Sequence, residues 1–557
     1  MVKIEVAKES MNIEVEPKPV IGLRSLPRRQ VILTLVGVLL AIFLGSLDQT
    51  IVGTAMPRII ADLGGFAHYT WVTTAYLVTS TVVLPITGKL TDMYGRKHFY
   101  TAGITVFILG SLLSGLSQTM TQIIIFRGLQ GIGAGIMMAN AFIVIGDLFP
   151  PAERGKYQGL ISAVFGISAI IGPILGGFIT DAFSWHWVFY INIPLGIGII
   201  ILFIFFFPNF RLGNLKHRID YAGITALVVA IVPLLLALSW GGTEYPWASA
   251  PVIGMFALSA VAIILLPIIE SRSDEPIIPL AIFRNPVVAV SIPIIFFTGC
   301  IMFGGIIFIP LYFQGVLGLS ATASGSFLMP MMLGQVVGSF GSGQLLARAG
   351  GHYRRQGALG LVTMALGLAL LSKITPETSY AIAIVDIVLV GFGLGVTLPL
   401  YTIAVQNAVS YNVLGAATSA VPFFRSMGGA VGLAIFGSVM TNRFASDFAA
   451  KLPETIKAVI PPQLLSSVTN SAQALLSFQV QDQLKALFSQ FGQQGAIFYE
   501  QTLQVLREAL NSGLKEIFII ALIVTILAFI INLFLKEIPL RKQHVLAEPI
   551  KNDKDNG

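Results

Sequence analysis

Residues 88–97 have the sequence GKLTDMYGRK and stand between two long apolar runs of the chain. The two glycines allow two helix ends to approach each other closely around a tight turn. Asp92 and Arg96 are near enough for a charge-assisted hydrogen bond, and the basic residues Lys89, Arg96 and Lys97 are typical of the cytoplasmic side of a membrane. An ordinary juxtamembrane loop would also be basic, but it would not need two glycines and an acid at these spacings.

The composition is that of a membrane protein. Of the 557 residues, 55% are hydrophobic and 11% are charged, and the mean hydropathy is +0.83; soluble domains carry about 25% charged residues. The net charge of +7 does not indicate nucleic-acid binding, because the basic residues lie at the ends of apolar runs, where membrane topology explains them. The single cysteine, Cys300, excludes an intramolecular disulfide. We therefore predict an all-α polytopic membrane protein whose surroundings are membrane lipid.

Apolar runs of about 20 residues, each long enough to cross a bilayer, recur about fourteen times along the chain. They lie near residues 31–55, 69–88, 99–118, 122–146, 158–180, 187–207, 220–240, 249–268, 288–312, 321–346, 356–373, 379–402, 416–441 and 514–535. An even number of spans places both termini on one side, and the basic residues of alternate loops predict that this side is the cytoplasm. The polar start of the chain is then a cytoplasmic tail and not a cleaved signal peptide.

A faint internal repeat divides the chain. Residues 343–350, GQLLARAG, echo residues 88–95, with Ala347 in the place of Asp92. Such repeats predict a transporter of two related bundles with the substrate path between them. The predicted units are a cytoplasmic N-terminal tail (1–30), a first six-helix bundle (31–207), two inserted spans with linkers (208–287), a second six-helix bundle (288–535) and a cytoplasmic C-terminal tail (536–557).

The longest stretch without a predicted span is 442–513, on the side away from the termini. Apolar residues recur in it at helical spacing, for example Leu484, Leu487 and Phe491. The pattern predicts an extracytoplasmic loop of amphipathic helices that lie on the outer face or the membrane interface. Its role is either a cap packed on the bundle or a surface that guides substrate or docks a partner.

Several motifs carry a resemblance to a known family. Residues 88–97 resemble the signature loop between spans 2 and 3 of the major facilitator superfamily. Residues 47–57, LDQTIVGTAMP, are similar to the first-span motif of its fourteen-span drug:proton antiporters, with Gly53 where Asn is common. Residues 127–133, RGLQGIG, resemble the span-4 motif, and residues 185–194, WHWVFYINIP, resemble a further family box with His186 in place of the usual Arg. The span-5 antiporter motif is matched by Gly166, Gly172, Pro173, Gly176 and Gly177.

The resemblance implies a major facilitator fold of two six-helix bundles plus two inserted central helices. It implies a proton-coupled efflux transporter in the bacterial cytoplasmic membrane, which exports lipophilic, cationic drugs by drug:proton antiport. The expected partners are small lipophilic molecules and protons, with no cofactor, no ATP and no nucleic acid, and the expected state is a monomer. Two other classes stay open: an exporter of an endogenous lipid, peptide or siderophore, and a non-transporting membrane scaffold or sensor.

Ionisable residues inside the predicted spans usually mark ion or substrate pathways, because each costs about 2.5–3.5 kcal/mol to insert. Four occur, Asp48, Arg127, Asp386 and Arg425, and the predicted proton-coupling residues are Asp48, Arg127 and Asp386. Asp48 is expected near the outer end of span 1, where a loop-edge acid in water is the alternative. Asp386 lies inside an apolar run, either as a cavity-lining acid or in an ion pair between helices. Burial disfavours the charged form of a carboxylate, so both acids are candidates for reversible protonation.

Arg127 stays charged at any physiological pH. The resemblance implies a role in proton coupling, in which Arg127 holds a carboxylate and releases it when a proton arrives; a snorkelling arginine at the outer interface is the alternative. Gln130 lies one turn on, on the same helix face, and can share this polar network. Gln130, Asp48 and Asp386 are therefore the predicted substrate-cavity residues.

Two further groups are predicted. The gating motif comprises Gly88, Asp92, Gly95, Arg96 and Asp147, where Asp147 joins the charge cluster of segment 88–97 or is a solvated loop acid instead. The glycines of span 5, with Pro173, form a tightly packed helix seam, and the resemblance implies that this seam prevents proton leak. Glycine triplets inside apolar runs are packing residues and not nucleotide loops, no Walker loop is present, and the six histidines have no metal-ligand spacing. No metal site is predicted, and no nucleophile–base set predicts an enzyme.

Overall fold

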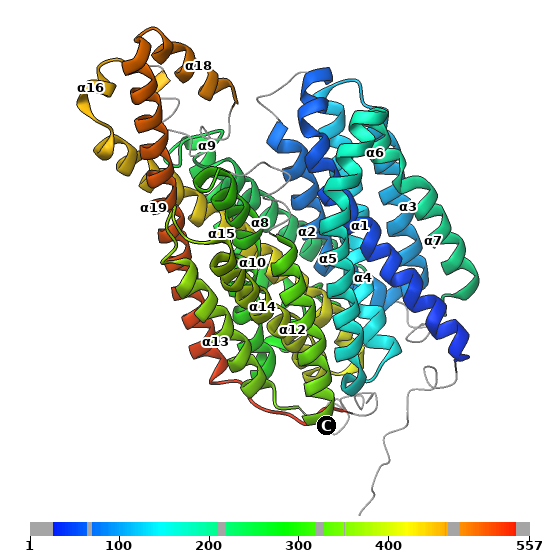
Figure 1. Ribbon diagram of the computed structural model, residues 1–557. Coiled ribbons are helices and arrows are strands. Elements are labelled where there is room, and N and C mark those ends of the chain that lie inside the picture. Colours follow the sequence, from blue (N-terminus) through cyan, green and yellow to red (C-terminus); the bar gives the residue numbers. More distant parts are fainter. Residues whose placement is uncertain are drawn as a thin grey trace, which may run out of the picture.

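The computed structural model describes residues 26–63, 69–208, 218–318, 328–349, 351–462, 464–465 and 478–541. These residues form helices and no named strand, which confirms the predicted all-α membrane class. Twelve helices in the described part are long and apolar enough to cross a membrane. Two less apolar helices, α12 (Leu328–Ala349) and α13 (Tyr353–Leu371), pack along α14 (Tyr380–Ala408) in the same bundle. Together with the twelve, they bring the passes of the described helices to fourteen. Figure 1 shows the arrangement of the helices.

The first half of the bundle contains six of these passes. They are α1 (Arg28–Leu63), α2 (Tyr69–Tyr94), α3 (Arg96–Gly115), α4 (Met120–Leu148), α5 (Pro151–Ala182) and the pair α6 (His186–Tyr190) and α7 (Asn192–Phe206). Gly95 has a φ of 94° and separates α2 from α3, a backbone conformation that only glycine adopts without strain. Thr119 begins α4 by accepting a hydrogen bond from the backbone N–H of Gln122.

Two inserted helices follow, α8 (Tyr221–Trp240) and α9 (Ala250–Glu270). They pack against each other, and α8 also packs on α2. Trp71 stacks on Trp240 with ring centroids 4.3 Å apart, and Thr74 hydrogen-bonds Ser239 at 2.9 Å. Leu227 and Ala230 of α8 also share a buried apolar cluster with Phe423 and Met427 of the second half, so the inserted pair contacts both halves.

The second half contains the remaining six passes. They are α10 (Pro286–Leu311), α12 (Leu328–Ala349), α13 (Tyr353–Leu371), α14 (Tyr380–Ala408), α15 (Leu414–Lys451) and α19 (Gly492–Asn532). Short helical segments accompany them: η2 (Leu280–Arg284), η3 (Tyr312–Val316), η4 (Tyr411–Val413), α16 (Glu454–Lys457) and α18 (Phe478–Ser489). We call the end of the bundle where α1 begins and α19 ends the terminal face, and the opposite end the cap face (Figure 1).

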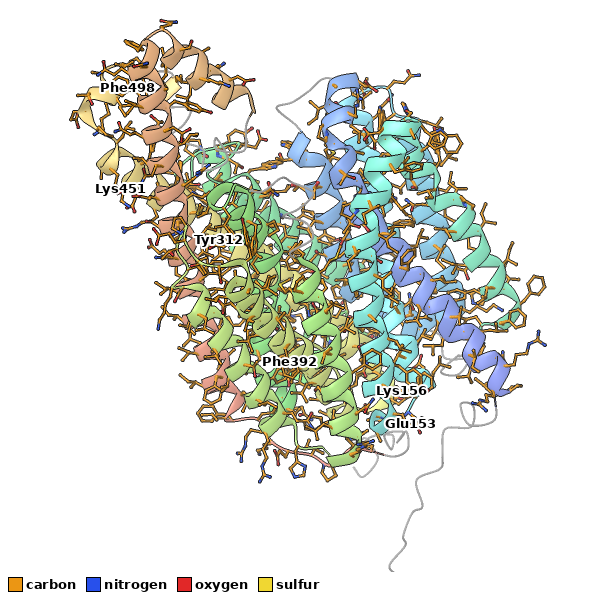
Figure 2. The ribbon with its side chains drawn as sticks, viewed as in Figure 1. Glu153, Lys156, Tyr312, Phe392, Lys451 and Phe498 are labelled. Carbon is orange, nitrogen blue, oxygen red and sulfur yellow. The ribbon has the colours of Figure 1, made fainter. Side chains whose placement is uncertain are left out.

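Residues 442–513 differ from the loop of surface helices that the sequence predicts. The described residues at both ends of this segment continue α15 and α19, whose 38 and 41 residues exceed the roughly 20 needed to cross a bilayer. The two helices extend together beyond the cap face, and Figure 2 shows Lys451 and Phe498 on this extension. The apolar faces of the described residues pack on one another: α18 packs on α19, and Phe448 and Leu506 are buried.

The two most extensive helix crossings between the halves are α2 on α15 and α5 on α12. A Cβ on Gly88 would collide with Ser419 and the backbone of Gly415, and a Cβ on Gly155 would collide with the backbone of Gly343. Both close approaches therefore require glycine. Gly88 and Gly343, which the internal repeat aligns, take matching positions at the two crossings. Both crossings lie toward the terminal face, where Figure 2 shows Glu153 and Lys156 of α5.

Candidate functional site

A buried polar cluster lies inside the first half, between α1, α4 and α7. The Arg127 guanidinium donates from Nη1 to Asp48 Oδ2 at 2.5 Å and to Gln130 Oε1 at 2.7 Å. Gln130 Nε2 donates to Asp48 Oδ1 at 2.9 Å, and Asn192 Nδ2 donates to the same oxygen at 2.9 Å. The exposed fraction is 0% for Asp48, Gln130 and Asn192 and 2% for Arg127. We call these four residues the Asp48 cluster.

The geometry corrects two alternatives from the sequence. Asp48 is not at the end of span 1, because α1 continues for four further turns, through Pro57, to Leu63. Arg127 does not snorkel to the interface, since its guanidinium is paired and lies 4.2 Å from the ring centroid of Tyr76. The Asp48 carboxylate therefore has three side-chain donors, from Arg127, Gln130 and Asn192.

Asn192 is a member of the cluster that the sequence does not predict. It lies within residues 185–194, whose resemblance to a family box assigns no role to any single residue. Asn192 begins α7 and also donates to Ser111 Oγ at 3.0 Å. Ser111 in turn donates to the backbone oxygen of Phe189 at 2.8 Å. This network fixes the Asn192 amide, so the amide can orient Asp48.

The predicted gating residues form a second buried cluster, at the terminal face. Arg96 forms ion pairs with Asp92 Oδ1 at 2.5 Å and with Asp147 Oδ2 at 2.9 Å. Asp92 Oδ2 accepts a hydrogen bond from the backbone N–H of Ala416 at 3.2 Å. Asp147 has no exposed surface, so the alternative of a solvated loop acid is wrong. The cluster joins α2, α3 and α4 to the start of α15, and thus the first half to the second.

Arg154 forms another connection between the halves, which no motif in the sequence predicts. Its side chain donates to the backbone oxygens of Phe149 and Gly146 at 2.8 and 2.6 Å, and to Gln406 Oε1 of α14 at 3.1 Å. Gln406 Nε2 donates to Thr418 Oγ1 at 3.2 Å. The terminal face is therefore closed by two buried polar connections in addition to the helix crossings.

The five predicted seam residues do not act as one group in the packing. A Cβ on Gly172 would collide with Thr50 of α1, and a Cβ on Gly176 would collide with Thr54 and approach the backbone oxygen of Ile51. Gly177 has open space instead, and Pro173 is exposed. A Cβ on Gly166 would make ordinary contacts with Met332 and Val336 of α12. The tight seam between α5 and α1 is thus formed by Gly172 and Gly176.

Asp386 is not brought to the Asp48 cluster. It lies in α14 of the second half, with an exposed fraction of 2%. No described residue forms an ion pair or hydrogen bond with its carboxylate, so the alternative of an interhelical ion pair finds no partner in the described part of the chain. The predicted set of Asp48, Gln130 and Asp386 therefore does not form one polar site.

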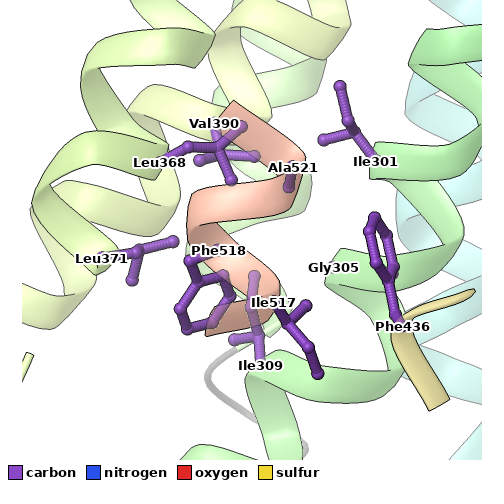
Figure 3. A pocket seen from close by; sticks show the side chains of 11 residues that line it. Ile301, Gly305, Ile309, Leu368, Leu371, Val390, Phe436, Ile517, Phe518 and Ala521 are labelled. Atoms are coloured by element: carbon purple, nitrogen blue, oxygen red, sulfur yellow. The ribbon is translucent and has the colours of Figure 1, made fainter. Parts of the chain in front are cut away.

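A pocket inside the second half is lined only by apolar side chains and glycine (Figure 3). Ile301 of α10, Val390 of α14, Phe436 of α15 and Phe518 of α19 face it from four helices. None of the predicted site residues lines this pocket. Its walls offer no hydrogen-bonding side chain.

Comparisons with known proteins agree with this architecture. The family model described as Major Facilitator Superfamily matches residues 38–433. The chain is 41% identical over 513 residues to multidrug transporter protein MdtP of Bacillus subtilis (strain 168), covering 91% of this chain and 93% of the relative. It is 39% identical over 502 residues to multidrug resistance protein 3 of the same organism, covering 90% and 94%. This chain is therefore a multi-pass membrane protein that belongs to the major facilitator superfamily.

A solved structure is similar in fold. The crystal structure of the human organic anion transporter MFSD10 (TETRAN) aligns with a TM-score of 0.53 and 13% sequence identity, covering 74% of this chain and 94% of that chain. At this identity the likeness concerns the fold alone. It agrees with the two helical halves described above.

Proposed function

We propose that the protein exports lipophilic, cationic drugs in exchange for protons. The observation that carries the proposal is the Asp48 cluster, in which a fully buried carboxylate is paired with a fully buried arginine. Ionisable groups this deep in a membrane protein mark ion or substrate pathways. The names of the two Bacillus relatives support a drug as the transported molecule.

The coupling follows from competition for one negative charge. A proton on Asp48 removes the charge that holds Arg127 and weakens the shortest contact of the cluster. A cationic drug is attracted by the same carboxylate when the proton has left. Proton and drug then bind alternately, and each state favours a different arrangement of the two halves.

The polar connections at the terminal face set the direction of access. We assign this face to the cytoplasm, since the basic segment 88–97 lies on it. The Asp92–Ala416 and Arg154–Gln406 hydrogen bonds would then close the path from the cytoplasm. Uptake of drug from the cytoplasm requires both connections to break.

Everted membrane vesicles with an acidified lumen test the proposal. Addition of cationic lipophilic drugs of several chemical types should collapse part of the pH gradient, and Asp48→Asn should abolish the response. Asp62→Asn is the matched control, because Asp62 lies on the same helix but is exposed. A full response in Asp48→Asn would rule out Asp48 as the coupling group, and no response to any drug in the unchanged protein would contradict drug:proton antiport.

A further inference from the structure

A groove on the surface of the second half lies between α12 and α13, with α14 as its floor. Both helices pack closely along α14 but contact each other only weakly. The groove has a volume of about 370 Å³, within the range of about 300–1,000 Å³ that small-molecule sites occupy. Its lining includes Gly341, Leu345 and Arg348 of α12, Leu359 of α13 and Phe392 of α14, and Figure 2 labels Phe392 in this part of the bundle.

The walls of the groove face the surroundings of the protein. Leu345 and Leu359 are 48% and 53% exposed, and a Cβ on Gly341 would have no neighbouring atom within 4 Å. The exposed side chains Val362 and Leu366 continue the apolar face of α13. In a membrane such side chains contact lipid, and the hydrocarbon core contains no water that could fill the groove. An acyl chain therefore occupies its apolar part.

The end of the groove at the terminal face is basic. Arg348 lies in the last turn of α12 and lines the groove. Arg355, in the first turn of α13 beside Arg354, lies one turn before Leu359 on the same helix face. All three arginines are exposed, and α12 and α13 contain no acidic residue within their described ranges. The apolar groove thus ends in a cluster of positive charge.

The dimensions of the groove match one leaflet of a bilayer. Gly341 stands seven residues before Arg348, which corresponds to about 10 Å along the helix, and one leaflet of the hydrocarbon layer is about 15 Å thick. Gln344 also lines the groove, one turn from Arg348 on the same helix face. An arginine can bind a phosphate through two parallel hydrogen bonds, and the Gln344 amide can donate to the ester oxygens of a glycerolipid.

We propose that this groove binds a phospholipid with an anionic headgroup, whose phosphate contacts Arg348 and whose acyl chain lies along Leu345, Leu359 and Phe392. An anionic headgroup is favoured over a zwitterionic one, because the arginines attract the phosphate and repel an ammonium group. Each basic residue at a membrane surface strengthens binding of anionic lipid by about fivefold. The site lies outside the Asp48 cluster, and the inference does not depend on the proposed efflux function.

Photolabelling of the purified full chain in detergent tests the proposal. The probe is phosphatidylglycerol with a diazirine in one acyl chain, and mass spectrometry locates the labelled peptides. The unchanged protein should be labelled within residues 341–359, and unlabelled phosphatidylglycerol should compete with the probe. Arg348→Gln should weaken the binding that this labelling measures by about fivefold. Arg272→Gln is the matched control, because Arg272 is exposed beyond the end of α9 and outside the groove, and it should leave the labelling unchanged.

A second variant tests the groove without a change of charge. Gly341→Leu places a side chain into the open space of the groove, so the protein should fold while the acyl chain is excluded and the labelling of residues 341–359 is lost. Gly254→Leu is its control, because Gly254 of α9 is exposed and has equally open surroundings. This control should be labelled like the unchanged protein.

Four results would overturn the inference. They are unchanged binding in Arg348→Gln, undiminished labelling in Gly341→Leu, equal competition by phosphatidylcholine, and equal competition by glycerol 3-phosphate. The third result would show that the arginines do not select the headgroup, and the fourth that a free phosphate ester and not a lipid is the ligand. The two competitions use the unchanged protein, so they decide even if a variant does not fold. No readout involves transport, so failure here would leave the efflux function untouched.

Discussion

The carboxylate of Asp92 in α2 accepts a hydrogen bond from the backbone N–H of Ala416, the third residue of α15. The first N–H groups of a helix have no partner within it, and a negative charge is favourable at this end. The same carboxylate pairs with Arg96. The Asp92 side chain therefore links the gating cluster of the first half to the start of α15 in the second half, 324 residues further along the chain.

We predict that Asp92→Ala loosens the closed terminal face. The substitution leaves the Ala416 N–H and the Arg96 guanidinium with fewer partners in a buried site, a loss of about 1–3 kcal/mol. In a Cys300→Ala background, a cysteine introduced at the buried position Ser419 should react with a maleimide several-fold faster when Asp92 is also replaced. Lys89→Gln is the control, because its ion pair with Glu275 is partly exposed and should contribute little. Equal labelling with and without Asp92→Ala would contradict the prediction.

We predict that Asn192 is a positioning residue for Asp48. Asn192→Ala removes one of the three donors to the carboxylate, and loss of a hydrogen bond to a charged group corresponds to about 10- to 100-fold in an equilibrium. The rate of drug-induced proton flux should fall by a similar factor, and the dependence of this rate on pH should shift. Ser111→Ala keeps the bond from Asn192 to Asp48, so its effect should be clearly smaller. Similar effects of both variants on flux and pH profile would show that Asn192 acts through packing only.

We predict opposite tolerances for two adjacent glycines of α5. Gly176→Ala places a methyl group against Thr54 and the backbone oxygen of Ile51, whereas Gly177→Ala enters open space. Overpacking of this kind costs about 1–3 kcal/mol. The midpoint of thermal unfolding of the detergent-purified protein should fall for Gly176→Ala and stay unchanged for Gly177→Ala. A lower midpoint for Gly177→Ala than for Gly176→Ala, or equal midpoints for the two variants, would contradict the tight packing of Gly176 against α1.

We predict that packing, and not ion pairs, holds the extension at the cap face together. Phe448 is fully buried and stacks near Phe444 with ring centroids 6.0 Å apart, so Phe448→Ala should destabilise the extension by about 3–5 kcal/mol. Lys451 and Glu508 pair at 3.4 Å with both side chains over 40% exposed, so Lys451→Ala should cost about 0–1 kcal/mol. Limited proteolysis of the extension measures the difference. Faster cleavage of the lysine variant than of the phenylalanine variant would reject this explanation.

The sequence by itself determined the class of the protein, the approximate positions of its spans and the pairing of Asp92 with Arg96. These features depend on local patterns: apolar runs of bilayer length, and residues four apart at a helix junction. The family resemblance identified Arg127 and Asp48 as functional residues. Local patterns alone could not have paired them, because they are 79 residues apart in the sequence and lie on two different helices.

Only the tertiary structure decided which distant groups meet. It brought Asn192 to Asp48, Arg154 to Gln406 and Asp92 to Ala416, and it left Asp386 in the other half. It also joined the ends of segment 442–513 to α15 and α19 as a projecting extension, because apolar faces predicted to lie on a membrane cover one another instead. Such contacts depend on how helices from separate parts of the chain pack, and the spacing of residues along one helix contains no information about the partner helix.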